Sequence, residues 1–144
     1  MTTFVGRVVN PGTVRGDCLV TRRGFNILAS YFHGIARADP TSHDRTNPDL
    51  YGRILAGSIL CLNQAVGSTT GGMILQCAAQ QGIAPAAMLF ADHIDSISAA
   101  GILLADIWND NRIIAIDQLG NEFLEAVSTG SVVEIAADGT VTLS

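Results

Sequence analysis

The stretch "SILCLNQAVGSTTGGMILQCAAQQG" (58–82) decides the fold of this 144-residue chain. It begins with an apolar run, SILCL (58–62), that is typical of a buried strand. A segment rich in glycine and hydroxyl residues then leads into the periodic apolar positions of a helix, expected over about 70–81. Gly82 is placed to end that helix at its C-terminal cap. A buried strand that runs into a helix in this way favours an α/β arrangement.

Strands and helices continue to alternate after this stretch, and β-structure flanks the alternating part on both sides. Asp95 or Ser96 is expected to cap the second helix. Residues 25–32 fit either a strand or a helical turn, and 38–52 form a long polar loop with two prolines. We therefore predict one α/β domain over 1–144, with a partly closed sheet and helices packed outside it. The other predicted elements are strands at 4–9, 16–21, 85–91 and 112–117, helices at 95–108 and about 119–127, and a terminal hairpin of 131–136 and 140–144.

The composition excludes several classes of protein. Apolar residues make up 48% of the chain and charged residues only 15%, which argues against intrinsic disorder. The net charge is −5 and the eight basic residues are scattered, so a nucleic-acid groove is not indicated. No apolar run approaches the length of a membrane span, and we expect a cytoplasmic protein. A surface this poor in charge also suggests that a partner covers part of it.

Neither the cysteines nor the histidines have the spacing of metal ligands. The three cysteines lie far apart in apolar surroundings and are expected to be reduced and buried. The three histidines do not converge with other ligands in the sequence, so no metal site is predicted on this chain. The residues concerned are Cys18, Cys61, Cys77, His33, His43 and His93.

The segment GSTTGG (67–72) is the best candidate site. A helix that starts at glycines presents unpaired backbone N–H groups, and its dipole favours an anion there. Gly67 and Gly71 allow a ligand close to the backbone, while Ser68, Thr69 and Thr70 add hydroxyl groups. The spacing matches neither a Walker loop nor a dinucleotide fingerprint. Simple capping of the helix by serine or threonine explains the same residues, and the two roles are compatible.

Two further groups of residues are candidate sites. Ser68, His93 and Asp95 contain the residue types of a hydrolase triad, but the segment lacks the G-x-S-x-G elbow, which argues against a hydrolase. Asp44 and Arg45 lie in the polar loop, where they either face solvent or reach a partner or the substrate. We favour the partner.

Three segments together resemble a known family. They are GRVVNPGTVRG (6–16), GSTTG (67–71) and APAA (84–87), within a likeness that covers nearly the whole chain. In these segments the sequence resembles the small subunit, or swivel domain, of the aconitase X family. The resemblance implies a swivelling β/β/α domain and a dehydratase that is active only with its large subunit.

The resemblance also implies roles for residues and partners. The large subunit would hold an iron–sulfur cluster with its own cysteines, and this chain would supply a catalytic serine that matches Ser68. Gly67, Thr69, Thr70 and Gly71 would then bind the substrate. Members of the family act on cis-3-hydroxy-L-proline or on mevalonate 5-phosphate. We expect the hydroxyproline, because the polar loop shows no basic pocket for a phosphate; the alternatives are the phosphorylated substrate and a stand-alone domain that binds a carboxylate or phosphate.

Overall fold

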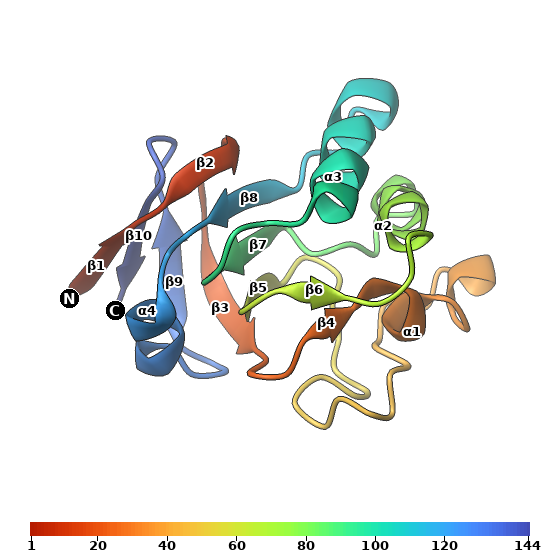
Figure 1. Cartoon of the computed structure of the whole chain (residues 1–144), viewed down its shortest axis with the longest axis horizontal. Helices are drawn as coiled ribbons and strands as arrows, with labels where there is room; N and C mark the ends of the chain where they lie inside the picture. Colours follow the sequence, from red (N-terminus) through yellow and green to blue (C-terminus); the bar gives the residue numbers. More distant parts are fainter.

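A computed structural model describes residues 1–144 and contains one large sheet of eight strands (Figure 1). Four neighbouring strands in its centre run parallel, and each of their buried apolar runs was predicted as a strand. Strands of a parallel sheet are covered on both faces, which explains why the last three of these four are buried at every position. The four strands are β3 (Val14–Val20), β5 (Ile59–Leu62), β7 (Ala87–Phe90) and β8 (Ile114–Asp117).

The sheet nearly closes on itself through its first two strands. β1 (Thr2–Val5) and β2 (Arg7–Asn10) occupy the two edges of the strand order, although only Gly6 separates them in the sequence. The prediction of a single strand over 4–9 was therefore wrong. β1 pairs with β10 whereas β2 pairs with β8, and a Cβ on Gly6 would lie 2.5 Å from the carbonyl oxygen of Asp117. The predicted hairpin is confirmed as β9 (Val132–Ile135) and β10 (Thr140–Leu143).

Three helices lie together on one side of the sheet, and a fourth lies at the other end of the molecule near both termini (Figure 1). The helix predicted over 70–81 is α2, and Gly82 ends it as expected. Gly82 has φ of 76°, and the N–H groups of Gly82 and Ile83 donate to Ala79 and Ala78 in the pattern of a Schellman cap. The helices are α1 (Ile27–Tyr31), α2 (Gly71–Gln80), α3 (Ser96–Asn109) and α4 (Asn121–Ala126), with a 3₁₀ turn η1 at Ile35–Arg37.

Two apolar cores stabilise this arrangement. One lies between the sheet and α1, α2 and α3, and includes Tyr31, Leu75 and Phe90. The other fills the curved part of the sheet, where Phe123 of α4 packs edge-on against Phe4 with ring centroids 5.5 Å apart. The expected α/β class with a partly closed sheet and flanking helices is confirmed.

A second, two-stranded sheet lies outside the main one and was not predicted. β4 (Phe25–Asn26) pairs in parallel with β6 (Ala65–Val66). The ambiguous segment 25–32 is thus a short strand followed by helix α1, because the side chain of Asn26 accepts a hydrogen bond from the N–H of Ala29 and caps the helix. β6 carries the chain from β5 towards the first turn of α2.

The long loop is held by its own polar side chains. Asp44 is buried and its carboxylate accepts hydrogen bonds from the N–H and the hydroxyl of Thr46, at 3.0 and 2.6 Å. The expectation that Asp44 contacts a partner was wrong, because the carboxylate is used inside the loop. Arg45 is exposed and lies over the ring of Tyr51. Among all the helices, none has the length and apolar character needed to cross a membrane.

Candidate functional site

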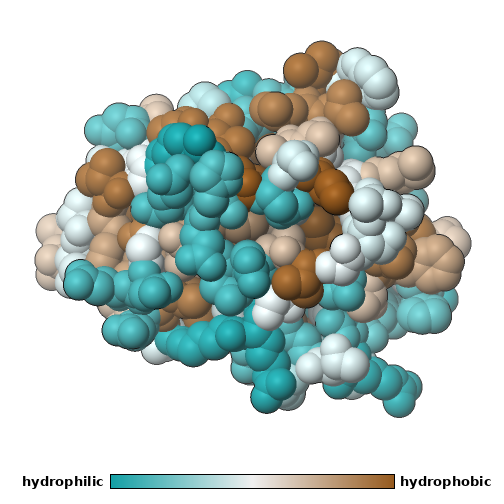
Figure 2. Space-filling model, viewed as in Figure 1, coloured by the Kyte–Doolittle hydropathy of each residue, from teal (hydrophilic) through white to brown (hydrophobic).

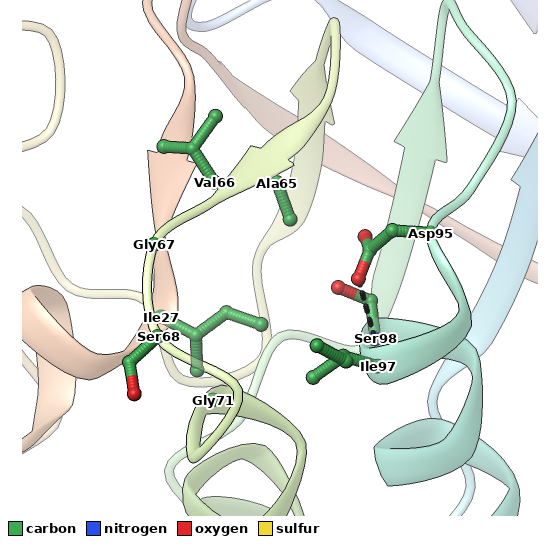
Figure 3. A pocket seen from close by; sticks show the side chains of 9 residues that line it. All are labelled: Ile27, Ala65, Val66, Gly67, Ser68, Gly71, Asp95, Ile97 and Ser98. Atoms are coloured by element: carbon green, nitrogen blue, oxygen red, sulfur yellow. Dashed lines mark hydrogen bonds between the residues drawn. The ribbon is translucent and has the colours of Figure 1, made fainter.

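A recess of about 190 Å³ opens where the end of β6, the first turn of α2 and the first turn of α3 meet (Figure 3). The predicted loop 67–70 forms one side of it and the start of α3 forms the other. Three of the five predicted site residues line the recess. Its lining residues are Ile27, Ala65, Val66, Gly67, Ser68, Gly71, Asp95, Ile97 and Ser98.

Gly67 gives the loop its sharp turn. Its φ is 106°, a conformation that residues with a Cβ rarely adopt, and a Cβ there would lie 2.8 Å from the side chain of Asn26. The same Asn26 caps α1, so the capped helix and the turn fit against each other. A glycine at position 67 is therefore required both for backbone conformation and for space.

Ser68 is exposed at the start of α2, and its hydroxyl is bonded only within the loop. The hydroxyl oxygen accepts the N–H of Thr70 at 3.1 Å, and the N–H of Gly71 donates to the carbonyl oxygen of Ser68 at 3.0 Å. Thr70 occupies the N-cap position without a side-chain hydrogen bond to the helix. Thr69 and Thr70 are exposed, and neither lines the recess. Capping therefore explains one hydrogen bond of the Ser68 hydroxyl, and the hydroxyl stays accessible from outside.

The first turn of α2 offers donors to a ligand. The backbone N–H groups of Gly72 and Met73 have no acceptor within the chain, as is usual at a helix N-terminus. The helix dipole places partial positive charge at the same point. Binding of an anion by this turn stays a prediction. Gly71 and Gly72 are buried, and Ser68 is exposed just before them.

The start of α3 adds two polar groups that the sequence analysis did not assign to the site. Asp95 is the N-cap, as predicted, and its Oδ2 accepts the N–H of Ser98 at 2.9 Å. Asp95 Oδ1 and Ser98 Oγ are both buried and have no hydrogen-bond partner. The sequence Asp-Ser-Ile-Ser predicts a helix cap, and Asp95 also belongs to the hydrolase triad that the sequence argues against. Neither pattern shows that Ser98 faces the recess.

Asp117 at the end of β8 holds the segment that leads into α3. Its carboxylate is fully buried, accepts two hydrogen bonds from Arg7 at 2.9 and 2.7 Å, and accepts the N–H of Ile94 at 2.8 Å. Burial alone would raise the pKa of Asp117, but the hydrogen bonds from Arg7 and Ile94 outweigh it and the pKa is lowered. The residue next to Asp95 is thus tied to the sheet by a charged group.

The hydrolase triad does not form. His93 Nδ1 is bonded to the carbonyl oxygen of Ile94 at 2.7 Å, and its Nε2 lies 3.4 Å from the guanidinium of Arg7. The imidazole therefore belongs to the Arg7–Asp117 cluster. Figure 3 shows the Ser68 side chain pointing away from Asp95. Ser68, His93 and Asp95 therefore make none of the hydrogen bonds to one another that a catalytic triad needs.

The two helices that frame the recess touch through their backbones. A Cβ on Gly101 of α3 would lie 2.5 Å from the carbonyl oxygen of Gly72, and one on Gly72 would lie 2.7 Å from that of Ile97. Two glycines therefore allow the start of α2 and the start of α3 to lie side by side. This contact holds together the two helices whose first turns line the recess.

The residues of this chain do not fit an iron–sulfur cluster or a metal ion. No group of three or more histidine, cysteine, aspartate or glutamate side chains is arranged around one point. Cys18 and Cys61 are buried in β3 and β5, and Cys77 is half-buried on α2. No step of the chemistry is therefore assigned to a metal on this chain.

Comparison with known proteins identifies the family. The sequence profile of the aconitase X swivel domain matches residues 3–143. The chain belongs to the aconitase X swivel-domain family. It is 33% identical, over 69% of its length and 68% of the relative's, to the phosphomevalonate dehydratase small subunit of Methanothrix thermoacetophila. It is 29% identical to the protein of that name from Archaeoglobus fulgidus, over 94% of this chain and 92% of the relative.

The fold of this aconitase X domain also matches a solved structure. The crystal structure of Thermococcus kodakaraensis aconitase X in its holo form superimposes with a TM-score of 0.82 at 24% identity, over 100% of this chain and 99% of the other. The resemblance stated from the sequence is thus confirmed in both family and fold. The chain is a dehydratase small subunit of the aconitase X family.

Proposed function

We propose that this chain is the small subunit of a two-subunit dehydratase that removes water from mevalonate 5-phosphate, with Ser68 as its catalytic residue. The relatives named above are phosphomevalonate dehydratase small subunits, and they support this substrate over the hydroxyproline that we expected from the sequence. That expectation depended on the missing basic pocket. A phosphate bound by the large subunit removes the objection.

The accessible serine at the start of α2 is the observation that carries the proposal. Dehydration next to a carboxylate requires a base for the α-proton and a group that assists departure of the hydroxyl. Ser68 is exposed just before the N-terminus of α2. Its hydroxyl oxygen accepts the N–H of Thr70 at 3.1 Å, and the helix dipole favours negative charge at this point. Such a site lowers the cost of forming a serine alkoxide. The group that assists the hydroxyl would be the iron–sulfur cluster of the large subunit.

Apolar surface beside the recess supports a large partner. Met73, Ile107 and Trp108 are 65%, 73% and 71% exposed on α2 and α3. Figure 2 shows hydrophobic side chains gathered over the far end of α3. A groove of about 360 Å³ between the two helices runs from Thr69 to Trp108. Exposed apolar surface of this kind marks contact with another protein, and its position would bring the large subunit against the Ser68 loop.

The test is reconstitution of this chain with its large subunit, followed by assays with mevalonate 5-phosphate and cis-3-hydroxy-L-proline. We expect turnover of the phosphorylated substrate by the complex and none by the isolated chain. Ser68→Ala should abolish turnover while the complex still assembles. Ser128→Ala is the matched control, because Ser128 is exposed after α4 and its hydroxyl makes no hydrogen bond.

Each outcome bears on a different part of the proposal. Turnover of hydroxyproline alone would overturn the substrate, and full activity of Ser68→Ala would remove the serine from the chemistry. Tight binding of a carboxylate or phosphate by the isolated chain, together with no activity in the complex, would favour the stand-alone binding domain instead.

A further inference from the structure

Two buried oxygens at the start of α3 face the recess without a partner. Ser98 is 1% exposed, and its Oγ has no hydrogen bond. The Oδ1 atom of Asp95 is also buried and has no hydrogen-bond partner, although the other oxygen of that carboxylate caps the helix. Figure 3 shows both side chains on the side of the recess opposite the Ser68 loop, with the Ser98 hydroxyl directed into the space between.

Helix capping does not explain this pair. The cap is a hydrogen bond from the backbone N–H of Ser98 to Asp95 Oδ2. It therefore does not involve Asp95 Oδ1 or the Ser98 hydroxyl. Buried polar groups are nearly always paired, and an unpaired one costs the free energy of its desolvation. Two such groups on one wall of a recess are therefore an indication of a ligand that completes their hydrogen bonds.

The pair is also held rigidly. Ile94, directly before Asp95, donates its N–H to the buried carboxylate of Asp117. Three residues after Ser98, Gly101 lies against the backbone of Gly72. The first turn of α3 is thus fixed to the sheet on one side and to α2 on the other, as expected of a preorganised binding site.

The chemistry of the two oxygens selects a hydroxyl group. A carboxylate oxygen only accepts hydrogen bonds, whereas a serine hydroxyl both donates and accepts. An alcohol can donate to Asp95 Oδ1 and accept from Ser98 Oγ, so it satisfies both. A phosphate offers only acceptors and negative charge, so Asp95 would repel it. The apolar side chains of Ile27, Ala65 and Ile97 line the remaining wall.

We propose that Asp95 and Ser98 bind the hydroxyl group of the substrate, and that Ile27, Ala65 and Ile97 pack against the apolar substituent on the same carbon. The second lone pair of the hydroxyl oxygen stays free, and it would face the cluster of the large subunit that assists its departure. This inference rests on the proposed function. Mevalonate 5-phosphate carries a hydroxyl and a methyl group on one carbon, which matches a polar pair beside an apolar wall. The recess, at about 190 Å³, takes the hydroxyl and methyl groups, and the negatively charged carboxylate and phosphate both lie outside it.

The experiment uses the complete two-subunit enzyme and two ligands. One is mevalonate 5-phosphate, assayed by its kcat/KM, and the other is its deoxy analogue with hydrogen in place of the hydroxyl, assayed as a competitive inhibitor. Ser98→Ala should lower kcat/KM about five- to tenfold, the effect of one hydrogen bond, and leave the inhibition constant of the analogue unchanged. Asp95→Asn should also lower kcat/KM and leave the inhibition constant of the analogue unchanged. Its amide oxygen can still cap α3, while its NH2 group replaces the acceptor Oδ1.

Ser96→Ala is the control, since Ser96 is exposed in the same turn and does not line the recess. It should change neither constant. An unchanged kcat/KM in Ser98→Ala, or an equal loss for both ligands, would overturn the hydroxyl site and assign the pair to a bound water or to packing. If the wild-type enzyme does not act on mevalonate 5-phosphate, the proposed function fails first and the hydroxyl site fails with it.

Discussion

The contact between Gly72 and Gly101 predicts that Gly101→Ala destabilises the domain, against the usual preference of helices for alanine. In an unconstrained helix the change from glycine to alanine stabilises by about 1 kcal/mol. Here the added Cβ would lie 2.5 Å from the carbonyl oxygen and 3.0 Å from the Cα of Gly72. Both are backbone atoms, so no side chain can rotate away and α2 and α3 must separate.

The expected loss of stability in Gly101→Ala is the difference between these two opposing effects. Overpacking a core typically costs about 1–3 kcal/mol, and a contact this short between backbones belongs at the upper end. After the gain in helix propensity is subtracted, the net loss is about 2 kcal/mol. For a domain of this length 1 kcal/mol corresponds to roughly 3 °C, so the melting temperature should fall by roughly 6 °C.

Thermal unfolding of the isolated chain, followed by circular dichroism, measures this shift. Gly71→Ala is the matched control, since its added Cβ would lie 3.5 Å from the Cβ of Ile27, an ordinary van der Waals distance. Its melting temperature should stay the same or rise. A melting temperature of Gly101→Ala at or above that of the wild type would refute a backbone contact this close between α2 and α3.

Three further predictions concern single residues of the site and its supports. Gly67→Ala should destabilise more than Gly82→Ala in chemical denaturation, because both have positive φ but only position 67 also lacks space for a Cβ; equal losses would contradict this. The pKa of Asp117 is lowered in the folded state, so its stabilising contribution is present above about pH 4 and is lost as the pH falls through the folded pKa. Acid titration of the unfolding free energy should therefore show a decline below about pH 4 that is smaller in Asp117→Asn, and an identical decline would argue against the assignment. Ser98→Ala should raise the melting temperature of the isolated chain by roughly 3 °C, since it removes a buried hydroxyl without a partner, and a clear decrease would mean that the hydroxyl is bonded in solution.

Local patterns in the sequence were enough to predict most elements of the fold. The apolar run at 59–62, the periodic positions of α2 and the cap at Gly82 all act over a few residues, so they can be recognised without the rest of the chain. The break at Gly6 could not be predicted in this way. It depends on the pairing of β1 with β10 and of β2 with β8, which are distant in the sequence.

For a similar reason, the sequence predicted only one side of the candidate site, the loop that carries Ser68. Ser68 stands out because glycines and hydroxyl residues lie next to a helix start, a local signal. Asp95 and Ser98 have only the local signal of a helix cap, and their second role depends on the position of α3 beside α2. That position follows from Gly101 meeting Gly72, a contact between residues 29 positions apart that no periodicity reveals.

We propose that this chain supplies one half of an active site whose other half lies on a larger partner. The most direct measurement is a titration of the purified large subunit with this chain, with dehydration of mevalonate 5-phosphate as the readout. We expect no turnover by either protein alone, and activity that rises with added chain until the two are equimolar. The Ser68→Ala chain should bind in the same proportion and give no activity. Turnover by the large subunit alone, unchanged when this chain is added, would rule out an active site shared between the two subunits.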